Sequence, residues 1–165
     1  MLEEILTGGF AELGLAADEE ALTRYRTYYE RLSEVNKVMN LTAISGEEDT
    51  ARLHFLDCAA LLTALDLRGK RVIDVGTGAG FPGLAVKVAC PDMDLTLLDS
   101  LDKRIGFLRE TCAALDFDDV ACIHARAEDA PAELREGFDA ALSRAVARLN
   151  VLCELALPFV KVGGR

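Results

Sequence analysis

The spacing of apolar residues divides the chain into a helical first part and an alternating second part. Residues 1–66 are predicted to be helical, and Leu22, Tyr25, Tyr29 and Leu32 form a stripe at helical spacing within them. Asp18 lies just before this stripe and is expected to be the helix N-cap. A connector is predicted at residues 36–44, and a second helix from about residue 49 to 65. The residues expected to face inward on that helix are Leu53, Leu56, Ala60 and Leu61.

Short β-rich runs alternate with amphipathic helices after Lys70. Strands are predicted at 71–75, 95–98, 120–123 and 138–142, and helices at 84–89, 102–115 and 146–157. This alternation is typical of an α/β fold, a doubly wound and mostly parallel sheet with right-handed crossovers. We expect a helical cap at 1–67 and a ligand-binding domain at 68–165, packed as a single compact unit. Because the chain ends in Val162-Gly163-Gly164-Arg165, C-terminal strands of such a sheet are expected to be missing.

Composition excludes several classes of protein. Of 165 residues, 51% are apolar and 28% charged, which is globular and argues against disorder. The net charge of −10 excludes a strongly basic nucleic-acid wrapper, although a local basic patch is compatible with it. No apolar run is long enough to span a membrane, and the N-terminus lacks the features of a secretion signal.

Cysteine and histidine usage indicates a cytoplasmic protein without a metal. The five cysteines are odd in number and lack the C-x-x-C spacing, so buried, reduced thiols are expected instead of disulfides or a zinc site. The two histidines, His54 and His124, lie far apart in the sequence, which argues against a histidine-based metal centre.

A glycine-rich segment follows the first predicted strand. Residues 78–83 (GAGFPG) match G-x-G-x-x-G between a strand and a helix, where glycine lets the backbone turn sharply and approach a ligand. This pattern alone is weak evidence, but two carboxylates flank it. Asp74 lies inside the apolar strand, where a charge is costly unless something pairs with it, and Asp99 ends the next strand. A carboxylate at the second position can accept hydrogen bonds from ribose hydroxyls.

Three interpretations of this loop compete. A dinucleotide such as NAD would use Asp99 but would place a diphosphate at the helix N-terminus and has no use for Asp74. S-adenosylmethionine (SAM) carries an ammonium group and a sulfonium, which suit an acidic residue leading into the loop. A turn without a ligand is the third. We favour SAM.

A series of motifs resembles a known family. They are Asn36-Lys37-x-x-Asn40-Leu41-Thr42-Ala43-Ile44, Arg52-x-His54-x-Leu56-Asp57, the glycine segment, Leu97-Leu98-Asp99-Ser100-x-x-Lys103-Arg104 and Ser143-Arg144-Ala145. Together, over essentially the whole chain, they resemble the RsmG family (glucose-inhibited division protein B). The resemblance implies a class I SAM-dependent methyltransferase with a Rossmann-like fold, which acts on guanine N7 of 16S ribosomal RNA, with the RNA expected to be bound within the small subunit. Val35 and Cys58 depart from the family, which usually has Trp and often Ser there.

The resemblance also implies site residues. It makes Gly76 and Phe81 contacts of SAM, places Ala127 and Glu128 near its adenine, and puts Arg144 at the cofactor or substrate pocket. Together with Asp74, Gly78 and Asp99 from the loop argument, these form the expected cofactor site.

The predicted chemistry needs no catalytic side chain beyond positioning. Guanine N7 has a lone pair and no proton, so a general base is not required. Ser143-Arg144-Ala145 stands where amine methyltransferases have an Asn/Asp-Pro-Pro-aromatic motif, and Cys153 lies in an apolar helix. The alternatives are an NAD-type oxidoreductase module and a non-catalytic interaction domain. His54 and Asp57, three residues apart on a helix, are expected to form a structural pair.

Overall fold

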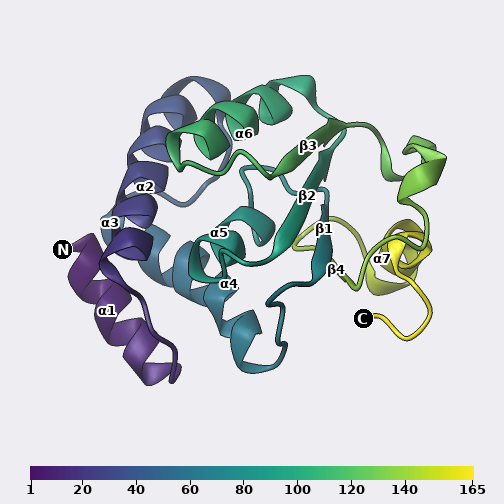
Figure 1. Ribbon diagram of the computed structural model, residues 1–165. Helices are drawn as coiled ribbons and strands as arrows, with labels where there is room; N and C mark the ends of the chain where they lie inside the picture. The colour runs from purple at the N-terminus through teal and green to yellow at the C-terminus, as the bar shows by residue number, and fades with distance from the viewer.

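The computed structural model describes residues 1–165 and is built on a parallel sheet with the strand order β3-β2-β1-β4 (Figure 1). The strands are β1 (Arg71–Val75), β2 (Asp94–Asp99), β3 (Ala121–His124) and β4 (Ala140–Leu142). β1 pairs in parallel with both β2 and β4, so Asp74 lies opposite Leu97 on one side and Leu142 on the other. The alternating pattern correctly predicted this parallel sheet, and β1 lies at its centre, where its backbone groups are paired on both sides.

Alternate residues of β1 face different layers of the molecule. Val72 packs into the larger core, with the helices α5 (Gly83–Ala89) and α6 (Asp102–Ala114). Ile73 and Val75 pack into a second, smaller core on the other face, near α7 (Leu149–Ala156) (Figure 1). Asp74 shares the face of Val72 and therefore points toward α5, the helix that follows the glycine loop.

The N-terminal helices pack onto the same side of the sheet as α5 (Figure 1). They are α1 (Leu2–Glu12), α2 (Glu19–Met39), α3 (Glu47–Thr50), a π-helical segment (Ala51–Leu56), α4 (Asp57–Ala59) and a 3₁₀ turn (Ala60–Thr63). Phe10, Tyr25 and Phe55 are fully buried and belong to the same core as α5 and β2. Arg26 ties this region together by bonding Glu3 and Glu47. The division into a cap at 1–67 and a domain at 68–165 stays a prediction.

Several element boundaries differ from the predicted ones for local reasons. Asp18 caps α2 as predicted, accepting a bond of 2.8 Å from the Ala21 amide. The helix, however, runs on through Asn36 and ends where Asn40 takes up a left-handed conformation with φ of 49°. Tyr28, and not only the predicted stripe, is fully buried, while Tyr29 is half-buried.

The predicted helix over residues 49–65 is interrupted. The π-helical turn at Ala51–Leu56 adds a residue to the helical repeat and rotates the following side chains. As a result Leu53, predicted to face inward, is 53% exposed, and His54 and Phe55 are buried instead. β4 and α7 are each shorter than predicted, beginning at Ala140 and Leu149.

The last residues of the chain lie along β4. The backbone of Arg165 bonds to Asp139 and Ala141, and Phe138 forms a parallel bridge with Val160. None of the helices is both long and apolar enough to cross a membrane.

Candidate functional site

The glycine loop leaves the carboxyl end of β1 in a conformation that side chains rarely adopt. Gly76, Gly78 and Gly80 have φ of 70°, 61° and 100°. A Cβ atom on Gly76 would come within 2.6 Å of Val146, so the loop also needs glycine for space. The amides of Gly76 and Thr77 donate to the Leu98 carbonyl at 2.8 and 3.1 Å, which fixes the loop against β2.

Asp74 lies beneath this loop with no solvent exposure. Its Oδ2 accepts a hydrogen bond of 2.7 Å from the Gly83 amide at the start of α5. A Cβ on Gly83 would lie 2.7 Å from this carboxylate, so only glycine allows the approach. Asp74 Oδ1 has no hydrogen-bond partner, and neither has the buried hydroxyl of Thr77. Burial raises the pKa of Asp74 to about 6, against the opposing effects of the nearby Thr77 hydroxyl, the Gly83 amide and the charge of Arg144; the Thr77 hydroxyl is close enough to favour the charged carboxylate but does not meet hydrogen-bond geometry.

Asp99 ends β2 and joins two loops. It is only 3% exposed. Its Oδ2 accepts from the Gly78 amide at 2.8 Å and its Oδ1 from the Leu101 amide at 3.0 Å. Arg104 approaches the same carboxylate at 3.6 Å. Each carboxylate oxygen can accept more than one bond, so Asp99 retains capacity for a ligand hydroxyl while it holds the loop.

A cavity of about 200 Å³ opens at the carboxyl ends of the strands, between the glycine loop and the segment after β3. Four of the predicted site residues line it together: Gly76, Asp99, Ala127 and Glu128. Gly78 joins them through its bond to Asp99. The carboxyl edge of a parallel sheet is where α/β folds bind ligands, which agrees with this clustering.

Phe81 and Arg144 form a second cluster beside the loop. The Arg144 guanidinium lies 5.1 Å from the centre of the Phe81 ring. His54 stacks on the same ring with centroids 4.1 Å apart and an interplanar angle of 5°. Arg144 also bonds the His54 ring at 2.6 Å and Asp57 at 3.2 Å. The predicted pair of His54 and Asp57 is therefore not formed by a direct hydrogen bond: each of them bonds Arg144, which lies 90 residues beyond His54.

Comparison with known proteins decides the family. The family model described as rRNA small subunit methyltransferase G matches residues 21–165. The chain is 49% identical over 163 residues to the ribosomal RNA small subunit methyltransferase G of Alkaliphilus metalliredigens, covering 97% of this chain and 68% of the relative. It is 43% identical to that of Acetivibrio thermocellus, covering 99% of this chain and 68% of the relative.

The chain belongs to this family. The rRNA small subunit methyltransferase G assignment confirms the family predicted from the motif series and the methyltransferase class.

Solved structures agree on the fold. A putative S-adenosyl-L-methionine-dependent methyltransferase of Methanococcus maripaludis aligns with a TM-score of 0.61 at 15% identity, over 82% of this chain and 59% of that one. A SAM-dependent methyltransferase of Aquifex aeolicus aligns with a TM-score of 0.53 at 23% identity, over 68% of this chain and 63% of that one. The predicted class I, Rossmann-like fold is confirmed.

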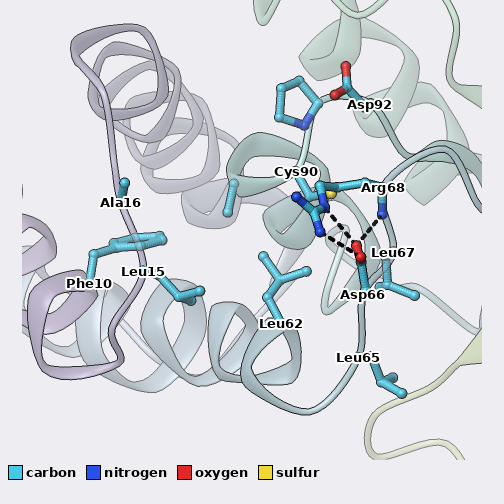
Figure 2. A pocket seen from close by; sticks show the side chains of 12 residues that line it. Phe10, Leu15, Ala16, Leu62, Leu65, Asp66, Leu67, Arg68, Cys90 and Asp92 are labelled. Carbon is cyan, nitrogen blue, oxygen red and sulfur yellow. Dashed lines mark hydrogen bonds and ion pairs between the residues drawn. The ribbon is translucent and has the colours of Figure 1, made fainter.

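A larger cavity, of about 480 Å³, lies at the opposite edge of the sheet (Figure 2). Its walls come from the end of α1, the segment before β1 and the turn before β2, as in Leu15, Leu67 and Asp92. Figure 2 shows Arg68 paired with Asp66 at its rim. None of the predicted site residues lines it.

Proposed function

We propose that this chain transfers the methyl group of SAM to N7 of a guanine in 16S ribosomal RNA of the small subunit. The family assignment supports the reaction class and the substrate class. The choice of SAM as cofactor is supported by one feature above all, the occupied N-terminus of α5.

The first amides of α5 already have acceptors within the protein. Gly83 donates to the Asp74 carboxylate, and Leu84 and Ala85 donate to the Gly80 carbonyl. A dinucleotide would need these amides for its diphosphate, and the carboxylate beneath them would repel it. A ligand that brings a positive charge to the loop is favoured instead, because Asp74 Oδ1 is buried without a partner. SAM carries such a charge, so the residues present fit it.

Each predicted residue would then contact a different part of the cofactor. Asp99 would accept hydrogen bonds from the ribose hydroxyls, and Ala127 and Glu128 would border the adenine in the cavity they share with Gly76. The loop at Gly78 and the carboxylate of Asp74 would face the ammonium end. When bound, SAM supplies an electrophilic methyl group.

The protein's part in the reaction is orientation. Guanine N7 has a free lone pair, so no side chain needs to remove a proton before attack. Arg144 lies beside the loop, 5.1 Å from the centre of the Phe81 ring, and would border the incoming base, while Phe81 stays a predicted contact of SAM. The Cys58 thiol does not act as a nucleophile here, because burial raises its pKa to about 12.

The RNA partner is proposed to be bound within an assembled small subunit, in the cytoplasm. The net charge of −10 disfavours affinity for naked RNA, since phosphate binding needs cations. Arg24, Arg26 and Arg31, which stand out in the sequence as basic, form ion pairs with neighbouring glutamates. Lys103 and Arg148 have no ion pair and flank the carboxyl edge of the sheet.

Two measurements test this proposal. Calorimetry should show binding of SAM and S-adenosylhomocysteine and none of NADH; the reverse would favour an oxidoreductase, and no nucleotide binding at all would favour an interaction domain. Incubation with small subunits that lack the modification, followed by mass spectrometry of the digested 16S RNA, should show 7-methylguanosine. Methylation of protein alone, or of another RNA position, would refute the substrate assignment.

A further inference from the structure

We propose that His54 is a positioning residue that, held by Thr42 and Asn36 of the N-terminal helical region, sets the orientation of Arg144 at the active site. The inference rests on the proposed function, because it assigns a task to residues around that site. It also gives a role to the two N-terminal motifs, residues 36–44 and 52–57, which have no part in the proposed binding of SAM.

The arrangement begins with a clamp between Asn36 and Thr42. The Asn36 side chain donates to the Thr42 carbonyl and accepts from the Thr42 amide, each at 2.9 Å. The Thr42 hydroxyl accepts from the Ile44 amide at 3.1 Å and lies 2.9 Å from His54 Nε2. The connector after α2 therefore presents one fixed hydroxyl to one nitrogen of the imidazole.

The other imidazole nitrogen faces Arg144. Nδ1 of His54 lies 2.6 Å from a terminal nitrogen of the guanidinium. A guanidinium only donates hydrogen bonds, so Nδ1 must be the acceptor and the ring proton must be on Nε2, where it can be donated to Thr42. This tautomer follows from the network. Burial and the charge of Arg144 lower the pKa of His54 to about 4, against the opposing charge of Asp57, so the ring is neutral near pH 7.

The same helical region supplies further partners of Arg144. The π-helical segment brings the Leu53 carbonyl to 3.2 Å from the guanidinium, and Asp57 lies 3.2 Å away. Arg144 itself follows β4 in an irregular segment, next to Ala145 with a φ of 57°. A free arginine side chain samples many rotamers, so contacts from the N-terminal region are what hold this one over Phe81.

A role for His54 as a general base does not fit the geometry. Both ring nitrogens are engaged, the side chain is 4% exposed, and attack by guanine N7 releases no proton that the histidine would have to accept. The histidine therefore acts through Arg144 and not on the substrate.

A double-mutant cycle on methyl transfer tests the proposal in the full chain. We expect Arg144→Ala to lower kcat by about 100-fold and His54→Phe, which keeps a flat ring but no acceptor, to lower it by about 10-fold. In the Arg144→Ala background, His54→Phe should cause no further loss. A further 10-fold loss in that background would show that His54 acts independently and would overturn the proposal.

Matched variants separate positioning from folding. His54→Asn restores an acceptor near the position of Nδ1 and should recover most of kcat relative to His54→Phe; equal loss in both would contradict the proposal. Thr42→Val should lower kcat, whereas Thr63→Val, at an exposed threonine whose hydroxyl bonds only the Ala60 carbonyl, should not. Equal effects of the two threonine variants would contradict the proposal.

Nitrogen NMR of the histidines needs no catalysis and so remains decisive if methyl transfer itself is not observed. His54 should be the neutral Nε2–H tautomer at pH 7 and should stay neutral down to about pH 5, and Arg144→Ala should raise its pKa. A wild-type His54 with the proton on Nδ1, or one unaffected by Arg144→Ala, would overturn the inference. Absent methyl transfer with these NMR results intact would count against the proposed function alone.

Discussion

Replacement of Asp74 by asparagine is expected to make the free protein more stable while it weakens cofactor binding. The carboxylate is fully buried, with one oxygen bonded to the Gly83 amide and the other without a partner. Asparagine has nearly the same shape, and its carbonyl oxygen can accept the Gly83 bond. The substitution therefore removes the buried charge and leaves the loop contact in place.

The magnitude follows from the pKa of Asp74, which burial raises from 3.8 to about 6. The folded protein thus binds a proton more tightly than the unfolded chain, so the wild type loses stability as pH rises from about 4 to about 6. A shift of about 2 pK units corresponds to about 3 kcal/mol. Asp74→Asn should match the wild type near pH 4 and exceed it by up to about 3 kcal/mol at pH 8.

Urea unfolding of both proteins between pH 4 and pH 8, without cofactor, measures this difference directly. The subtraction isolates Asp74 because all other titrating groups are shared. Calorimetry at pH 8 should show SAM binding at least 10-fold weaker in the variant, about 1.4 kcal/mol, because its ammonium loses a charged partner. A stability difference that does not change with pH, or a variant that binds SAM as tightly as the wild type, would refute the reasoning.

Four further substitutions probe the fold and the loop. Gly83→Ala should destabilise the protein by about 1–3 kcal/mol and abolish SAM binding in calorimetry, because the new Cβ would lie 2.7 Å from Asp74. Gly106→Ala is the matched control: Gly106 lies in α6 with open space around it, so this substitution should stabilise the protein by about 0.5–1 kcal/mol. Lys87→Ala should cost about 3 kcal/mol in urea unfolding, since its buried ammonium bonds the Pro91 and Met93 carbonyls and Asp119; an unchanged midpoint would contradict this. Asp99→Asn should weaken SAM binding about 10- to 100-fold, because one loop amide would face an amide group, and unaltered affinity would exclude the carboxylate from the site.

The parallel sheet was predictable because its signal is local. The apolar runs at 71–75 and 95–98, each followed by a helical pattern, leave few topologies once right-handed crossovers are required. The glycine loop was predictable for the same reason, because its glycines are a local signal. Gly76 and Gly80 have positive φ, a conformation that glycine adopts far more easily than other residues. Asp99 was predictable from its place at the end of a strand, whereas Ala127 and Glu128 were predicted only from the family resemblance; the three residues line one cavity.

The N-terminal half was less predictable, because its geometry depends on a change of helical period. The sequence of residues 51–56 does not indicate a π turn, and without that turn Leu53 is expected to face inward. The environment of Arg144 is likewise invisible in any window of sequence, because Thr42 and His54 meet it only through the tertiary fold. The motif series identified these residues without indicating what they touch.

The long-range hold on Arg144 bears on how such an enzyme can be divided or recombined. A chimera that joined the sheet of this protein to the leading helices of a distant relative would keep every glycine and both carboxylates of the cofactor loop, yet its guanidinium would lose its anchorage. Such a hybrid should still capture the cofactor but turn over poorly. A few hydrogen bonds therefore couple the N-terminal helices to the sheet domain. Recombination between related genes is expected to give an active enzyme only when both parts come from the same parent.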